Sequence, residues 1–315
     1  MSDSRHLGIA VAQMGPVHLN DSRAAVVKRL VEMLNEAASR GAKLVVFPEL
    51  ALTTFFPRYW MTEEEAVERF FERSMPNKDV QPLFDAAKAR GVGFYLGYAE
   101  LTPSGERFNT SILVDANANI IGKYRKIHLP GHSDHKVDAP FQHLEKKFFE
   151  VGDVGIPVFE AFDTRVGMCL CNDRRWPETW RVMSLQSAEV GVLGYNTPSV
   201  NIHWNEPVHL RMSTHLVSLQ ASAYQNAMWI AAAAKCGSED GHHMIGGSVI
   251  VAPTGEIVAR AISEDDEVIA TSADLSWVEN FRNHVFNFAK HRRPEHYKII
   301  VERTGAGEPL PIPKI

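Results

Sequence analysis

An alternation of short apolar runs with amphipathic helical patterns constrains the fold of this chain more than any other feature. Residues 7–14 form an apolar run with strand character, and residues 44–47 form a second, shorter one. Between them, apolar residues recur at spacings of three and four, which is typical of a helix with one buried face: Val26, Val27, Leu30, Val31, Leu34 and Ala38. Asn20 and Asp21 offer the N-cap of this helix, and Gly41 ends it.

The alternation continues along the chain and predicts one α/β domain. We expect helices over residues 80–90, 177–186 and 209–225, and strands over residues 92–98, 110–115, 166–170, 190–193 and 228–234. Residues 248–253 and 256–261 flank Thr254-Gly255, which predicts a hairpin. Because no repeat, linker or composition break is present, residues 1–303 are expected to be a single domain. The pattern alone does not exclude a doubly wound sheet.

Residues 304–315 differ in composition from the rest of the chain. This tail is rich in Gly and Pro, with Pro309, Pro311 and Pro313 at alternate positions, and we expect it to be extended. It is either a frayed terminus or an arm that reaches a neighbouring subunit.

Composition and charge exclude several classes of protein. The 315 residues are 45% hydrophobic and 23% charged, which is ordinary for a globular enzyme. A net charge of −5 argues against a nucleic-acid partner. No segment approaches the roughly 18 apolar residues of a membrane span, and no apolar signal-peptide stretch follows the first six residues. Three cysteines, an odd number, fit a reducing compartment, so a cytoplasmic location is expected.

Three separated fragments carry the chemistry. They are Val46-Phe47-Pro48-Glu49, Tyr124-Arg125-Lys126-Ile127-His128 and Cys171-Asn172-Asp173-Arg174-Arg175-Trp176-Pro177-Glu178. They supply a carboxylate, an ammonium and a thiol, each at or just beyond an apolar run. A nucleophilic thiol needs a base, and the oxyanion that it generates needs a fixed positive donor. The set therefore points to amide-type C–N hydrolysis through a covalent thioester.

Other interpretations of the same residues remain open at this point. Cys169 and Cys171 are two apart and would face the same side of a strand, and a lone cysteine is usually a small buried hydrophobe. As metal ligands they lack a second cysteine pair. The 14 histidines include no His-Glu-x-x-His spacing, so no metal is expected.

The three fragments resemble the nitrilase superfamily of carbon–nitrogen hydrolases, and most closely the N-carbamoyl-D-amino-acid hydrolases. The closer resemblance rests on residues 48–58, 122–132 and 140–146 and on the Cys171 fragment, and similarity extends from about Gly8 to about Tyr297. It implies a four-layer α-β-β-α sandwich that associates through its helical outer faces into a homo-oligomer, a dimer or a tetramer.

The resemblance assigns the catalytic residues. Its nucleophile stands six residues before the proline of a Pro-Glu pair, which selects Cys171 and leaves Cys169 in the core. The Lys-x-His-Leu pattern selects Lys126 for the oxyanion, and Glu49 becomes the proton carrier. Glu145 matches a second glutamate that orients the lysine, although Val151 stands where a proline often precedes the glycine. The alternative for Glu145 is an ordinary glutamate on a helix surface.

The resemblance also implies the substrate and its contacts. Arg174 and Arg175, with Asn172, Asn196, Thr197 and His143, would hold the α-carboxylate and the ureido group of a small-molecule substrate. If one arginine is instead buried in a structural ion pair, the substrate need not be acidic. For the thiol of Cys171, the N–H groups of a following helix predict a lowered pKa.

The implied reaction is hydrolysis of N-carbamoyl-D-amino acids to D-amino acid, CO2 and ammonia without a cofactor. Enzymes with the same machinery are the alternatives: a β-ureidopropionase, an N-carbamoylputrescine amidase, an aliphatic amidase or a nitrilase. A catalytically silent scaffold subunit is a further one. Residues 199–212 depart from the carbamoylase pattern, and the D preference rests on the resemblance alone.

Overall fold

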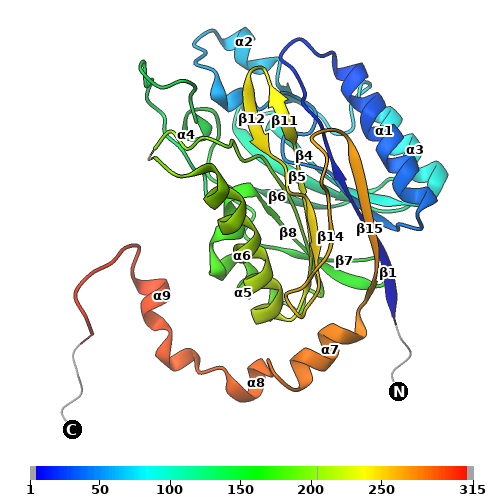
Figure 1. Cartoon of the computed structure of the whole chain (residues 1–315), viewed down its shortest axis with the longest axis vertical. Coiled ribbons are helices and arrows are strands. Elements are labelled where there is room, and N and C mark those ends of the chain that lie inside the picture. Colours follow the sequence, from blue (N-terminus) through cyan, green and yellow to red (C-terminus); the bar gives the residue numbers. More distant parts are fainter. Residues whose placement is uncertain (1–4, 204, 311–315) are drawn as a thin grey trace.

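The computed structural model describes residues 5–203 and 205–310, and it contains two β-sheets packed face to face (Figure 1). The first sheet has the strand order β15-β1-β2-β4-β5-β6, with β3 paired to β4. Its strands are β1 (His6–Gln13), β2 (Leu44–Val46), β3 (Phe71–Glu72), β4 (Gly93–Leu101), β5 (Arg107–Val114), β6 (Ile120–Arg125) and β15 (Glu267–Asp274).

The second sheet has the order β14-β13-β10-β9-β8-β7. Its strands are β7 (Val158–Ala161), β8 (Thr164–Leu170), β9 (Val190–Tyr195), β10 (Trp229–Ala234), β13 (Val249–Val251) and β14 (Ile257–Arg260). A separate two-stranded ribbon consists of β11 (Cys236–Glu239) and β12 (His242–Ile245).

Helices cover the outer face of each sheet (Figure 1). Helices α1 (Arg23–Ser39) and α3 (Gln81–Arg90) pack on the first sheet, and α5 (Pro177–Leu185) and α6 (Val208–Asn226) cover the second. The shorter helices are α2 (Glu64–Glu68), α4 (Glu145–Phe148), α7 (Ser276–Asn283), α8 (Phe288–His291) and α9 (Lys298–Glu302), and residues Phe56–Arg58, Cys171–Arg175 and Pro294–His296 form 3-10 turns. The result is a four-layer α-β-β-α sandwich, as expected.

Strand β1 shows why the layers form. Ile9 and Val11 belong to the core between the sheets, whereas Ala10 and Ala12 belong to the core beneath α1 and α3. Successive side chains of a strand point to opposite faces of the sheet. A strand that is apolar at every position is therefore buried on both sides, here by a second sheet and by a helix layer.

The helices and strands expected from the sequence are present, with ends shifted by a few residues. The predicted N-cap of α1 was wrong. Ser22 caps this helix and accepts a hydrogen bond from the Ala25 N–H, because the Asp21 carboxylate is already bound to the His18 N–H at 2.8 Å. Strands β6 and β15 and the β11–β12 ribbon were not predicted, because polar residues interrupt their apolar pattern.

The C-terminal segment leaves the sandwich as an arc of short helices, α7 to α9 (Figure 1). Residues 304–310 are exposed and contain no helix or strand. Pro311 and Pro313, which carry part of the expectation for the tail, lie outside the described residues. The single domain over residues 1–303 stays a prediction. Within the described ranges, no helix has the length and apolar character needed to cross a membrane.

Candidate active site

Four predicted side chains meet where the strands end. Glu49 lies just past β2, Lys126 follows β6, Cys171 follows β8, and Glu145 begins α4. The side chains of Glu49, Lys126 and Glu145 have no solvent exposure, and Cys171 is also buried. The sulfur of Cys171 and one carboxylate oxygen each of Glu49 and Glu145 lie within 4.8 Å of one another.

Lys126 bridges the two carboxylates. Its Nζ lies 2.7 Å from Glu49 Oε1 and 2.5 Å from Glu145 Oε2. The ammonium thus binds the two carboxylates that, with Cys171, could otherwise ligate a metal ion, and it offsets one of their two negative charges. We therefore interpret this group as an ammonium-centred site.

Glu49 is fixed by three donors. Besides Lys126, its Oε1 accepts a bond from Asn109 Nδ2 at 2.8 Å, and its Oε2 accepts one from the Asn196 N–H at 2.9 Å. Asn109 Nδ2 also lies 3.4 Å from Glu145 Oε2. The other oxygen of Glu145 contacts His143 Nε2 at 3.3 Å. Both carboxylates therefore have a single well-defined orientation.

Close approach of backbone places Glu49 between the sheets. A Cβ atom on Gly194 would lie 2.3 Å from the Glu49 nitrogen, and one on Gly97 would lie 2.7 Å from the Glu49 Cα. Only glycine leaves room for the chain at these two positions. The next residue, Leu50, has a φ of 45°, so the chain turns sharply directly after Glu49.

The two glutamates differ in their proton affinity. Burial, opposed by Lys126 and assisted by Glu145, raises the pKa of Glu49 above its ordinary value of 4.5. Burial also acts to raise the pKa of Glu145, but Lys126 and His143 hold it below 4.5. Burial acts to lower the pKa of Lys126, and the charges of Cys171, Glu145 and Glu49 outweigh it and keep the ammonium protonated. Glu49 is thus the carboxylate suited to carry a proton.

Cys171 begins the 3-10 turn Cys171–Arg175 and has a φ of 44°, a left-handed conformation that is strained for a residue with a side chain. Its Sγ lies 3.5 Å from the Asn196 carbonyl oxygen. Cys171 is the first residue after β8, whereas Cys169 lies within that strand, and both are buried in the core between the sheets.

The expectation of a lowered thiol pKa was wrong. Burial, assisted by Glu49, raises the pKa of the Cys171 thiol to about 11 although Lys126 and Arg174 act to lower it. Helix α5 begins only at Pro177, six residues after Cys171 in the chain. A thiol with a raised pKa needs a base at the moment of attack, and Glu49 can supply it.

The two neighbouring arginines have different environments. Arg174 is buried, and its guanidinium donates to the Cys171 carbonyl oxygen at 2.6 Å, to His215 Nδ1 at 3.1 Å and to Thr197 Oγ1 at 3.1 Å. Arg175 is exposed and makes no hydrogen bond or ion pair with the residues that the structure describes. The positive charge of the neighbouring Arg174 lowers the pKa of Arg175 to about 10.

The other predicted residues lie around this centre. Asn196 Nδ2 donates to the Glu49 carbonyl oxygen at 2.8 Å, and its buried Oδ1 has no partner among the described residues. Thr197 contacts Arg174, and His143 contacts Glu145. Asn172 points its amide to the His128 carbonyl oxygen at 3.0 Å. Among the described residues of the predicted set, Arg175 alone makes no hydrogen bond, although Cys171 is among the charges that act on it.

Sequence reasoning missed Asn109, Tyr195 and His215. The Tyr195 hydroxyl lies 2.8 Å from His215 Nε2, and the ring of Tyr195 lies beneath the Arg174 guanidinium, so both residues fix Arg174. Asn109 begins the polar run Asn109-Thr110-Ser111 inside a buried strand. Three polar residues in such a strand were the only signal for it, and they do not reveal which side chains they meet.

The sequence profile of the carbon–nitrogen hydrolase family matches residues 8–283. The chain belongs to the carbon–nitrogen hydrolase family. Among similar proteins, a nitrilase of Pyrococcus abyssi is 31% identical over 92% of this chain and 98% of its own length. An N-carbamoylputrescine amidase of Arabidopsis thaliana is 30% identical over 90% of this chain and 91% of its own length.

The structure of a carbon–nitrogen hydrolase from Helicobacter pylori has the same fold, with a TM-score of 0.82 and 23% identity over 95% of this chain and 99% of that one. The resemblance to the nitrilase superfamily and the sandwich fold are thereby confirmed, and the chain is a cysteine-dependent C–N hydrolase of that superfamily. None of these three relatives is named as an N-carbamoyl-D-amino-acid hydrolase, so the narrower resemblance stays a prediction.

Proposed function

We propose that this carbon–nitrogen hydrolase cleaves the ureido C–N bond of N-carbamoyl amino acids, with the D series as its substrates. The observation that carries the proposal is the unpaired Arg175. Arg174 and Arg211 place positive charge near Arg175, and the Glu206 carboxylate partly offsets that charge. Glu206 is itself paired with Arg211 at 2.9 Å. A substrate carboxylate would relieve this local excess of positive charge and match the guanidinium fork.

The proposed reaction begins at the thiol. Glu49 takes the proton of Cys171 as the sulfur attacks the ureido carbonyl carbon, and Lys126 stabilises the oxyanion together with the Asn172 N–H. Glu49 then gives the proton to the departing ammonia, which leaves an acyl group on the sulfur. Glu145 keeps Lys126 charged and oriented throughout.

The acyl group is removed by water. Glu49 takes a proton from the water as its oxygen attacks the acyl carbon, and the thiol is restored. The released carbamate loses CO2 and yields the free amino acid, so that one ureido substrate and one water give amino acid, CO2 and ammonia. The free Oδ1 of Asn196 supports recognition of an N–H donor on the ureido group, and Thr197 and His143 would complete the wall around it.

A carbamoylated amine without a carboxylate is the second candidate substrate. It is favoured by the similarity to N-carbamoylputrescine amidases, of which the Arabidopsis thaliana protein is 30% identical to this chain. The surroundings of Arg174 favour it as well. Arg174 is buried and its guanidinium donates to protein atoms, so Arg175 is the one arginine of the pair left to bind a substrate carboxylate. Such a substrate would make no use of Arg175.

Release of amino acid from paired N-carbamoyl-D- and N-carbamoyl-L-amino acids tests the proposal. Cys171→Ala is the blank, and Cys169→Ala is its matched control, because Cys169 is a buried free cysteine only two residues earlier, in β8. We expect release from the D series that is lost in Cys171→Ala and kept in Cys169→Ala. Turnover of N-carbamoylputrescine alone would favour the second candidate, and no turnover of either would reject both.

We also propose a cytoplasmic homo-oligomer that works without a metal. The three free cysteines support the location, and the position of Lys126 between the carboxylates supports metal-free chemistry. Neither nucleic acid nor membrane is a proposed partner, in keeping with the net charge of −5.

A further inference from the structure

A second buried charged group lies beside the active site. Arg58, Lys235 and Glu239 form this cluster, and the side chains of Lys235 and Glu239 have no solvent exposure. Glu239 lies 2.7 Å from Arg58 Nη2 and 3.1 Å from Lys235 Nζ. Burying three charges is costly unless each has a defined partner. None of the three side chains hydrogen-bonds to Glu49, Lys126, Glu145 or Cys171 in the described chain.

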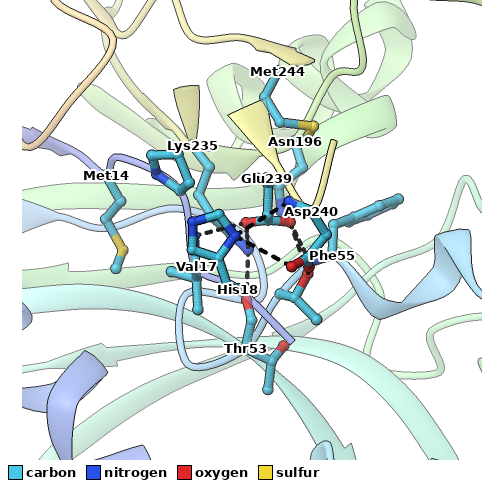
Figure 2. Close-up of polar contacts among 12 residues, drawn as sticks. Met14, Val17, His18, Thr53, Phe55, Asn196, Lys235, Glu239, Asp240 and Met244 are labelled. Carbon is cyan, nitrogen blue, oxygen red and sulfur yellow. Dashed lines mark hydrogen bonds and ion pairs between the residues drawn. The ribbon is translucent and has the colours of Figure 1, made fainter. Parts of the chain in front are cut away.

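Glu239 joins three separate segments (Figure 2). Its oxygens accept bonds from the Val17 N–H at 3.1 Å and the Phe55 N–H at 2.6 Å, in addition to the two cations. Lys235 Nζ donates to the Thr53 carbonyl oxygen at 2.5 Å. The loops after β1 and β2 are thus attached to the junction between β10 and the β11–β12 ribbon.

Asp240 extends the same attachment. Its carboxylate accepts bonds from the Tyr59 hydroxyl at 2.8 Å, the Thr54 hydroxyl at 3.0 Å and the Leu19 N–H at 3.0 Å. The segment from Thr54 to Tyr59 is therefore bound at both ends by the neighbouring carboxylates of Glu239 and Asp240. Burial acts to raise the pKa of Glu239, but Lys235 and Arg58 hold it below its ordinary value, so the carboxylate is charged.

This segment carries the wall of the active site that contains Glu145. The Arg58 carbonyl oxygen accepts a bond from the Gln142 N–H, and the Pro57 carbonyl oxygen accepts one from the Leu144 N–H, both at 2.9 Å. Glu145 is the next residue, and it binds Lys126. Any movement of the backbone at residues 57–58 would therefore reach the Lys126–Glu145 pair through two hydrogen bonds.

The ribbon carries the opposite wall. The Ile245 N–H donates to the Thr197 carbonyl oxygen at 2.9 Å, and the Ser199 N–H donates to the His243 carbonyl oxygen at 2.9 Å. Asn196, the neighbour of Thr197, binds Glu49 and contacts the sulfur of Cys171 through its backbone. The Arg58–Lys235–Glu239 cluster is thus where the supports of both walls join.

We propose that Arg58, Lys235 and Glu239 are positioning residues that set the distance between the Lys126–Glu145 wall and the Asn196–Thr197 wall, and thereby the reactivity of Cys171. The inference rests on the proposed role of Cys171 as nucleophile. The cluster itself touches no reacting atom. Its loss should change how the sulfur is surrounded by Glu49, Lys126, Glu145 and Arg174 in a protein that is still folded.

Alkylation of Cys171 by iodoacetamide tests this without any knowledge of the substrate. The rate is measured against pH by peptide mass spectrometry at a temperature where each variant is folded by circular dichroism. The Glu239→Gln change leaves two buried cations without their carboxylate. We expect the pH midpoint of Cys171 alkylation to differ from that of the wild type and the alkylation rate to be at least about tenfold lower. The matched control is Glu189→Gln, because Glu189 is paired with Arg5 and Thr164 before the start of β9, away from the site.

A second variant separates positioning from stability. Lys235→Met combined with Glu239→Gln removes one of the two unpaired cations, so the thermal midpoint of this double variant should rise above that of Glu239→Gln. The alkylation rate should stay low, and the pH midpoint of alkylation should stay different from that of the wild type. A wild-type alkylation profile in the folded Glu239→Gln protein would overturn the proposal. So would a double variant whose alkylation recovers together with its thermal midpoint. If no N-carbamoyl amino acid is hydrolysed, the proposed function fails while this test remains decisive.

Discussion

Asn109 links the carboxylates of Glu49 and Glu145, since its one amide nitrogen faces both of them. Lys126 links them by charge, and Asn109 links them by hydrogen bonds. A neutral donor at this position stabilises the ionised form of Glu49, the acceptor of the thiol proton. In the proposed mechanism Asn109 is therefore a positioning residue for the two carboxylates.

Replacing Asn109 by Leu should lower kcat more than it raises KM. The change removes a hydrogen bond to a charged group, worth about 1.5–3 kcal/mol, so we expect kcat to fall by roughly 10- to 100-fold. Steady-state kinetics of hydrolysis measures it. Thr110→Val is the matched control, because Thr110 is the adjacent buried residue and binds Glu100 instead. Equal losses in both variants would contradict the assignment.

The pKa of Glu49 should appear in the pH dependence of kcat/KM. Glu49 accepts the proton when ionised, and burial raises its pKa, so activity should rise with pH through a midpoint above the ordinary value of 4.5. Lys126, whose pKa is raised well above 10.5, stays charged over the same range. Hydrolysis measured from about pH 4 to about pH 9 tests this. An acid midpoint at or below 4.5 would contradict it.

At the scale of elements, the ends of β2 and β9 determine where the base lies. The chain from Pro48 to Leu50 passes between the sheets, where Gly97 of β4 and Gly194 of β9 leave it room. The carboxylate then meets the Asn196 N–H two residues after Gly194. A single strand thus provides both the space for Glu49 and one of its hydrogen bonds.

A methyl group at Gly194 should impair the enzyme without touching any catalytic side chain. Gly194→Ala would place a Cβ 2.3 Å from the Glu49 nitrogen, so the loop must shift, and a shift of about 1 Å can cost about 100-fold in rate. We expect kcat to fall by that order while the far-ultraviolet circular dichroism is kept. The control is Gly305→Ala, where no atom lies within 4 Å of the added methyl. An unchanged kcat in Gly194→Ala would show that the loop tolerates displacement.

The positions of the main site residues could be predicted from the sequence. The orientations of neighbouring side chains and the long-range ion pairs could not, because they depend on the folded chain. Glu49, Lys126 and Cys171 follow apolar runs, so their place at strand ends was visible. Arg174 and Arg175 looked equivalent, but the 3-10 turn that holds them points one inward and leaves the other exposed. The ion pair of Arg58 and Glu239 joins residues 181 positions apart, and no local pattern encodes such a partner.

At the scale of the whole molecule, the outer face of α5 and α6 stays apolar and open. Val182, Leu185, Val217 and Tyr224 are exposed there, and a groove of about 960 Å3 separates these helices from α8 and α9. Exposed apolar surface of this kind is typical of a subunit interface. The arc of α7 to α9 extends away from the sandwich on the same side (Figure 1).

We expect the protein to be a dimer or tetramer by light scattering after size exclusion. Val217→Asp, which buries a charge if this face is an interface, should shift the population towards monomer. Ile262→Asp is the matched control, because Ile262 is an exposed apolar residue between β14 and β15. A monomeric wild type, or equal behaviour of both variants, would contradict association through α5 and α6.

In the proposed mechanism Cys171 forms a covalent intermediate, which can be detected directly. The enzyme is mixed with an N-carbamoyl-D-amino acid, quenched in acid within the first turnovers, digested and analysed by mass spectrometry with fragmentation. We predict a mass increase equal to the substrate less ammonia on Cys171, with Cys169 unmodified. Continued turnover with no adduct on Cys171, or an adduct on Cys169 instead, would contradict the account.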